Sequence, residues 1–213
     1  MGISDNIYSI RKNIPSNINL VAVSKKKSYA EILEAYRSGQ RIFGENRVQE
    51  LISKKDKLPS DINWHMIGHL QRKKVKYIAS FISLIHAVDS TQLLEEINKR
   101  AAQNNRIIDC LLQVHIAQED TKFGFNPLEI KNVIKESKEF NNINIKGLMA
   151  MATFTDNKQQ INMEFSRINQ LFKELKTEKL NTLSIGMSSD YQIAINNGST
   201  MIRVGSAIFG KSN

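Results

Sequence analysis

The sequence predicts an α/β fold, a single (β/α)8 barrel. Short apolar runs rich in β-forming residues recur along all 213 residues, and segments with helical periodicity separate them. Near-continuous apolar strands that alternate with helices indicate a parallel sheet covered on both faces. Eight such units fit a closed TIM-like barrel with tight loops. An open doubly wound sheet is the alternative, but its dinucleotide fingerprint G-x-G-x-x-G is missing from the sequence.

The predicted strands share an apolar, β-branched or aromatic character. In chain order they cover residues 18–25 (INLVAVSK), 41–44 (RIFG), 62–68 (INWHMIG), 84–89 (LIHAVD), 107–116 (IIDCLLQVHI), 143–151 (INIKGLMAM), 182–188 (TLSIGMS) and 200–205 (TMIRVG). Six of the eight runs end in a polar residue or glycine, as expected where a strand passes into a loop.

Two helix starts have recognisable capping chemistry. Ser28 and Glu31 form an S-x-x-E capping box, and residues 126–129 (NPLE) supply a cap, a proline at the first helical position and a glutamate at the third. We expect helices to begin at both places.

The longest helical segment carries a stripe that predicts a face packed on the core. This stripe consists of Ile161, Phe165, Ile168, Phe172 and Leu175.

Two glycines mark expected helix ends. Gly39 and Gly198 each stand where a helix is expected to stop.

Composition indicates one globular domain over residues 1–213, since 41% of the residues are apolar and 24% are charged. The N-terminus lacks a signal-peptide pattern, and no apolar run reaches about 18 residues. A lone Cys110 inside an apolar run can form no internal disulfide, so we expect it in the core. These features favour the cytoplasm.

The formal net charge of +9 raises the possibility of nucleic-acid binding. Between residues 129 and 139, however, three lysines are interleaved with three glutamates, which is typical of a solvated helix face. We therefore expect no nucleic-acid or membrane partner; salt-sensitive retention of RNA or DNA would contradict this. The four histidines show no metal-ligand spacing, so no metal site is expected.

Active sites of such barrels form at the carboxyl ends of the strands. The polar residues of this chain collect at those positions. They are Ser24 and Lys25, Gly44 to Asn46, Gly68 and His69, Asp89, Gly186 to Asp190, and Arg203 to Ser206. His69 is predicted to line a pocket there, the alternative being a hydrogen-bonded core histidine.

The end of the first strand places a lysine in line with the barrel interior. Side chains alternate along a strand, so Lys25 shares the face of Val21 and Val23. An amine there would be partly desolvated beside the charges of Lys26 and Lys27, conditions that expose a nucleophile for imine formation. The alternative is that all three lysines are solvated charges at a helix entry.

The last two strand ends predict a phosphate site. Residues 186–190 (GMSSD) supply two hydroxyls and backbone amides before an expected helix, and residues 204–210 (VGSAIFG) supply amides flanked by glycine. The loops after strands seven and eight are the usual phosphate site of these barrels. Ordinary turn and cap chemistry is the alternative for both segments.

Taken together, these motifs give the chain a family resemblance that runs from about Leu20 to Gly210. The segments are VAVSK, FGENRVQE, WHMIGHLQRKKVK, HAVDS, GLMAMAT, LSIGMSSDYQIAI and IRVGSAIFG. In this order they resemble the pyridoxal phosphate homeostasis protein family. The resemblance implies a barrel similar to the N-terminal domain of alanine racemase, with pyridoxal 5'-phosphate (PLP) as cofactor.

The resemblance also implies residue roles. Lys25 would hold PLP as a Schiff base, Arg203 would face the pyridine nitrogen, and Asn46 would lie beside the ring. The residues implied for the phosphate are Ser188, Ser189, Gly205 and Ser206. The family often has other residues at Phe123, His115 and Arg47, which leaves the pocket edge near the second and fifth strands open.

We expect a PLP carrier in vitamin B6 homeostasis rather than a strong catalyst. A fixed cation at the ring nitrogen opposes its protonation and weakens the ring as an electron sink. The racemases that the chain resembles also use a base from an added domain and a partner subunit, which a single barrel lacks. The expected partners are PLP and apo-enzymes that use it, and a monomer is expected. The alternative is a small PLP-dependent amino-acid racemase or related enzyme.

Overall fold

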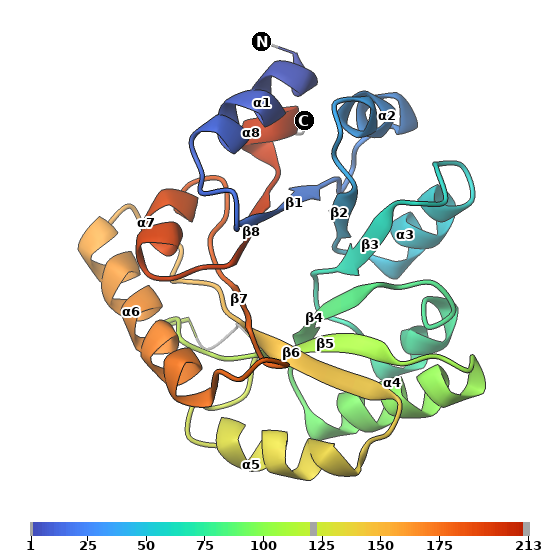
Figure 1. Cartoon of the computed structure of the whole chain (residues 1–213), viewed down its shortest axis with the longest axis vertical. Coiled ribbons are helices and arrows are strands. Elements are labelled where there is room, and N and C mark those ends of the chain that lie inside the picture. The colour runs from blue at the N-terminus through green and yellow to red at the C-terminus, as the bar shows by residue number, and fades with distance from the viewer. Residues whose placement is uncertain (1, 120–122, 211–213) are drawn as a thin grey trace.

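The protein is described here from a computed structural model, over residues 2–119 and 123–210. Eight parallel strands form a closed barrel in the order β1 to β8, as the sequence predicts (Figure 1). The strands are β1 (Asn19–Val23), β2 (Ile42–Glu45), β3 (Asn63–Met66), β4 (Leu84–Val88), β5 (Ile108–Gln113), β6 (Ile143–Met149), β7 (Thr182–Ser184) and β8 (Met201–Val204).

Helices surround the strands (Figure 1). The α-helices are α1 (Ile3–Lys12), α2 (Tyr29–Arg37), α3 (Val48–Lys55), α4 (Thr91–Gln103), α5 (Ile130–Glu136), α6 (Lys158–Leu175), α7 (Tyr191–Asn196) and α8 (Ser206–Phe209), with 3-10 turns η1 (Arg72–Tyr77) and η2 (Ser137–Glu139). α1 packs beside α8, and the Asn6 side chain donates to the carbonyl of Ile208 at 2.9 Å (Figure 1).

The first and last strands close the barrel. β1 pairs with β8 so that Val21 lies opposite Arg203 and Ala22 opposite Val204. On its other edge β1 pairs with β2, where Val23 lies opposite Gly44. The carboxyl ends of these strands therefore meet at one mouth of the barrel.

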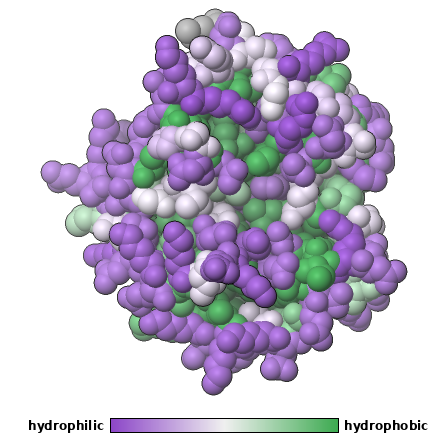
Figure 2. Space-filling view, viewed as in Figure 1, coloured by the Kyte–Doolittle hydropathy of each residue, from purple (hydrophilic) through white to green (hydrophobic). Residues whose placement is uncertain are grey.

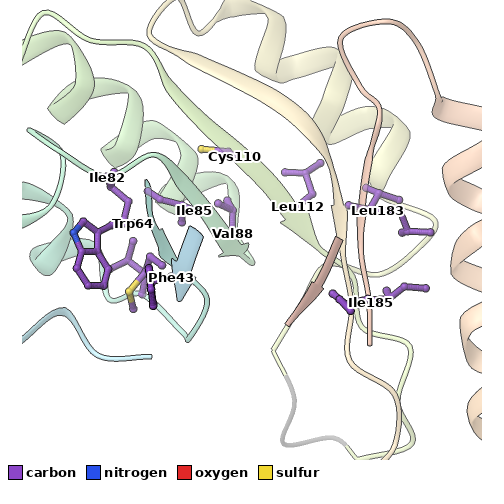
Figure 3. Close-up of a cluster of buried hydrophobic side chains, with 14 of the residues drawn as sticks. Phe43, Trp64, Ile82, Ile85, Val88, Cys110, Leu112, Leu183 and Ile185 are labelled. Carbon is purple, nitrogen blue, oxygen red and sulfur yellow. The ribbon is translucent and has the colours of Figure 1, made fainter. Parts of the chain in front are cut away.

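Apolar side chains fill two separate layers. The larger one lies between the strands and the helices and includes Phe43, Trp64, Cys110 and Leu183 (Figure 3). The burial predicted for Cys110 is thus confirmed. The smaller layer fills the barrel interior and consists of Val21, Leu84, Ala87, Leu111, Met149 and Met201.

Of the two predicted helix starts, one is confirmed and the other lies three residues too early. α2 begins as predicted, because the Ser28 hydroxyl accepts from the amide of Glu31 and the Glu31 carboxylate accepts from the amide of Ser28. The Glu129 carboxylate accepts from the amide of Asn126, and the Asn126 side chain accepts from the amide of Leu128, but residues 127–129 form a turn. The prediction that a helix begins there was wrong by three residues, since α5 starts at Ile130.

The predicted stripe and helix stops are confirmed. Four of the five stripe residues are buried in α6 and Leu175 packs against the core. Gly39 and Gly198 have φ of 91° and 81°, which glycine adopts without strain. Hydrophilic residues cover most of the face in Figure 2. No helix in the described ranges combines the length and hydropathy that crossing a bilayer requires.

Gly147 of β6 lies opposite Thr182 of β7. A Cβ built there would lie 1.7 Å from the carbonyl oxygen of Thr182. We predict that Gly147→Ala lowers the free energy of unfolding by more than about 4 kcal/mol, measured by urea denaturation. Gly39→Ala is the control, because its Cβ meets nothing within 4 Å, and only its backbone strain costs about 1 kcal/mol. Equal losses would contradict the assigned contact.

Candidate functional site

The predicted site residues lie at the carboxyl ends of neighbouring strands. Asn46 follows β2, Lys25 follows β1, Gly205 follows β8, and Ser188 follows β7. Since β2, β1, β8 and β7 are consecutive around the closed sheet, the four positions form an arc along one mouth of the barrel.

Lys25 lies in a tight turn between β1 and α2. The amide of Lys27 donates to the carbonyl of Ser24 at 3.0 Å, and Lys26 adopts φ of 59°. Lys25 is exposed, and the Lys27 amine is paired with Glu31 at 3.2 Å. The expectation that Lys25 is partly desolvated was therefore wrong, because the turn carries it past the end of β1 to an exposed position.

A buried ionic group holds this turn from the helix side. The Lys54 amine donates to the carbonyl of Ser24 at 2.8 Å and to Glu45 Oε1 at 2.7 Å. The Ser24 hydroxyl donates to the same Glu45 oxygen at 2.6 Å. Glu50 accepts from Lys54 and from the amide of Lys26. The Ser24 carbonyl, the Ser24 hydroxyl and the Lys26 amide are thus held by the Lys54 amine and by the carboxylates of Glu45 and Glu50.

Glu45 is the centre of that group and is completely buried. Burial raises the pKa of its carboxyl, while hydrogen bonds and charge from Lys54 oppose the rise. Its Oε2 atom has no hydrogen-bond partner within residues 2–119 and 123–210. Lys54 therefore stabilises a carboxylate that would otherwise favour its neutral form.

Arg203 lies in the barrel interior, on the same face of β8 as Met201. Its Nη1 donates to the carbonyl of Ser184 at 2.7 Å and to the Ser184 hydroxyl at 2.6 Å, and its Nη2 donates to the carbonyl of Ala150 at 3.1 Å. Its Nε–H and its second Nη2–H have no hydrogen-bond partner among the described residues. Burial lowers the pKa of Arg203 to about 10, opposed by the charge of Asp190, so the guanidinium stays cationic at neutral pH.

The loops after β7 and β8 are joined through Ser188. Its hydroxyl oxygen accepts from the amides of Gly205 at 3.1 Å and Ala207 at 3.4 Å. Asp190 accepts from the amide of Met187 and fixes the first of these loops. Ser189 and Ser206 are exposed beside them. The predicted phosphate-binding residues are thus brought together, with the amide donors of one loop facing a hydroxyl of the other.

Asn46 and His69 share a pocket of about 330 Å³ with Arg47 and Lys74. The pocket-lining position predicted for His69 is confirmed. Its Nδ1 lies 2.8 Å from Asp89 Oδ2, and the exposed ring of Phe123 stacks on it at 3.9 Å. The pocket adds an aromatic and basic edge to the mouth.

Several polar residues of the site were missed by sequence reasoning. Lys54, His86 and Ser184 are all buried and contact predicted site residues or their support. Strand alternation could have found His86, which has even spacing from the inward-facing Leu84. His115 binds the carbonyl of Glu119 within its own loop.

Comparisons with known proteins agree over nearly the whole chain. The family model described as "Alanine racemase, N-terminal domain" matches residues 2–213. The pyridoxal phosphate homeostasis protein of Aquifex aeolicus is 38% identical over 196 residues, which cover 90% of this chain and 86% of the relative. That of Haemophilus influenzae is 35% identical, covering 93% and 86%.

Solved structures give the same result. PipY of Synechococcus elongatus without PLP superimposes with a TM-score of 0.93 at 35% identity, covering 98% of this chain and all of PipY. The same protein with PLP bound gives a TM-score of 0.89 at 34% identity, with the same coverage. An alanine racemase of Clostridium difficile, at 14% identity and a TM-score of 0.80, shares the fold over 57% of its own length.

Replacing Lys54 tests the buried ionic group that holds the turn after β1. We predict that Lys54→Met costs about 3–5 kcal/mol in unfolding free energy, because it strands the Glu45 carboxylate in the core. Without Lys54, the already raised pKa of Glu45 should rise further. A raised carboxyl pKa means that the folded chain binds the proton more tightly, so stability falls as pH increases through that pKa.

Urea denaturation at about pH 5 and pH 8 measures this, and the loss should be larger at the higher pH. Adding Glu45→Gln to Lys54→Met should restore part of the stability. Lys55→Met, at the next residue of α3, is the control: the Lys55 side chain is 39% exposed and its ion pair is with exposed Asp56, so stability should change by less than about 0.5 kcal/mol. A loss independent of pH would refute a charged Glu45.

Proposed function

Because the chain belongs to the alanine racemase N-terminal domain family, and within it to the pyridoxal phosphate homeostasis proteins, we propose that it binds PLP at the mouth formed by β7, β8, β1 and β2. In this proposal it holds the cofactor reversibly and serves intracellular vitamin B6 homeostasis. PipY, a relative at 34% identity over 98% of this chain, has been solved with PLP bound.

The observation that carries the proposal is the pairing of β1 with β8. It brings Lys25, an exposed amine able to form an imine with an aldehyde, beside the strand that carries Arg203. Gly205 and Ser206 follow Arg203 directly, and Ser188 is hydrogen-bonded to the amide of Gly205. In this proposal the amine for the aldehyde, the donor to the ring nitrogen and the amides for the phosphate would follow or lie on neighbouring strands.

Each end of the site fits one part of PLP. The amides of Gly205 and Ala207, now bound to the Ser188 hydroxyl, would donate to phosphate oxygens, with Ser189 and Ser206 beside them. The free Nε–H and Nη2–H of Arg203 would donate to the pyridine nitrogen. Asn46 would lie at the ring on the side of β2. PLP itself supplies an aldehyde and an electron-withdrawing ring when bound.

Arg203 supports a carrier role over strong catalysis. A ring nitrogen that accepts a hydrogen bond from a guanidinium stays unprotonated, which limits stabilisation of negative charge on a bound amino acid. Lys25 is open to solvent, so amines and water can reach the linkage. We propose that the chain works as a cytoplasmic monomer and passes PLP to apo-enzymes, with no nucleic acid involved.

One observation favours the alternative of a weak PLP-dependent racemase. His69 shares a pocket with Asn46 and is oriented by Asp89, which is the arrangement of a histidine that moves protons. The Nε2 atom of His69 has no hydrogen-bond partner among the described residues, so it could meet a ligand in that pocket.

Reductive trapping tests the cofactor site. Borohydride reduction of the protein with PLP should give a stable adduct that peptide mass spectrometry locates on Lys25. Lys25→Ala should give no adduct, whereas Lys26→Ala, which removes the neighbouring exposed amine, should retain it. An adduct spread over several lysines would mean that these amines are ordinary surface groups, and the proposed site would fall.

Chiral analysis separates the carrier from the enzyme. Incubated with PLP and a panel of L-amino acids, the protein should form D-amino acid no faster than Lys25→Ala does. Steady turnover that disappears both in Lys25→Ala and in His69→Gln would instead establish an enzyme with His69 as its base. Circular dichroism of both variants should confirm that the fold is intact.

A further inference from the structure

A line of four polar side chains crosses the barrel interior. His65 Nδ1 lies 2.9 Å from His86 Nε2, His86 Nδ1 lies 3.1 Å from the Ser184 hydroxyl, and that hydroxyl accepts from Arg203 at 2.6 Å. The four residues come from β3, β4, β7 and β8, and none is more than 5% exposed. They are embedded next to the apolar interior layer of the barrel.

Elementary hydrogen-bond chemistry fixes the direction of every bond in this line. A guanidinium only donates, so the Ser184 oxygen must accept from Arg203. The Ser184 proton then needs an acceptor, and among the described residues His86 Nδ1 is the one within reach. If His86 carried a proton on Nδ1, the buried hydroxyl proton would have no acceptor, which is costly.

Both imidazoles complete the same pattern as neutral rings. Burial lowers the pKa of His65 to about 3 and holds that of His86 well below its usual value. A neutral His86 that accepts at Nδ1 carries its proton on Nε2 and donates to Nδ1 of His65. His65 therefore carries its own proton on Nε2, and it lines a cavity of about 250 Å³ at the opposite, amino-terminal mouth.

We infer that His86, acting through Ser184, is a positioning residue for Arg203. Because each group in the line accepts from the Arg203 side and donates away from it, the negative end of every dipole faces the guanidinium. The line thus holds the Nη1 edge in one orientation while the free Nε–H and Nη2–H edge remains available to a ligand. Ser184 and the two neutral histidines carry no charge, so they do not neutralise the positive charge of the Arg203 guanidinium.

This inference rests on the proposed function in one respect, namely that the free edge of Arg203 meets the pyridine nitrogen. Loss of His86 would leave the Ser184 hydroxyl without an acceptor and would loosen the orientation of Arg203. Bound PLP would then escape faster, and the pH at which its visible absorption changes would shift, since that spectrum reports the ring and imine protonation states.

The line itself can be tested without PLP. In the ligand-free protein, ¹⁵N–¹H correlation spectra of the histidine rings should show His65 and His86 as neutral rings protonated on Nε2, unchanged between about pH 5 and 8. His69, which is partly exposed, serves as an internal reference. A proton on Nδ1 of His86, or a cationic ring at either position, would overturn the assigned direction.

The positioning role is tested on the PLP-loaded protein. His86→Leu should raise the PLP release rate about five- to tenfold, the loss expected for one hydrogen bond in support of a charged group. His86→Asn, whose amide oxygen replaces the Nδ1 acceptor, should restore most of the difference. Ser184→Ala should act like His86→Leu, and the double variant should release PLP no faster than either, because both break one line.

The outcomes separate the two proposals. Additive effects of His86→Leu and Ser184→Ala, or no rescue by asparagine at unchanged melting temperature, would overturn the positioning role. An unaltered protein that retains no PLP would overturn the proposed function and with it the link to the ring nitrogen, whereas the histidine spectra would still decide the direction of the line.

Discussion

The pairing of β1 with β8 is the constraint on which the rest of the molecule depends. Lys25 and Arg203 are far apart in the sequence, and the pairing of the first strand with the last brings them together. Barrel closure sets Val21 opposite Arg203, so the turn after β1 and the loop after β8 emerge together. Contacts outside the sheet support this closure, since the Lys27 amine donates to the carbonyl of Phe209 and α1 packs on α8.

Two clusters of buried polar residues lie on opposite faces of the strands and hold different parts of the site. On the helix side, Glu45 and Lys54 hold the turn that presents Lys25. On the inner side, His86 and Ser184 support Arg203. A strand that slipped by one residue would exchange its faces and place ionic groups among apolar side chains. Both clusters therefore make alternative strand registers less stable, in addition to positioning Lys25 and Arg203.

The features predictable from sequence were those coded locally. All eight strands were found because apolar runs and helical stripes are properties of neighbouring residues, and barrel topology then placed Lys25, Ser188 and Gly205 at one mouth. Hydrogen bonds between side chains far apart in the sequence could not be predicted from such local patterns. Nothing near Lys54 in the sequence shows that its amine reaches Ser24, because that contact depends on how α3 packs. The exposure of Lys25 was misjudged for a similar reason, since strand alternation says nothing of the turn that follows.

The two ends of the proposed site differ in burial, and this difference fits a protein that holds a cofactor and gives it up. Arg203 is fixed by carbonyl and hydroxyl oxygens in the barrel interior, so its charge and position change little. Lys25 stands on a solvent-exposed turn, where an imine can exchange with water or with another amine. An enzyme gains from enclosing its reactive linkage, because excluding water protects intermediates from side reactions. A carrier gains from the reverse, since an open linkage beside a firmly oriented ring permits binding and release through the same mouth.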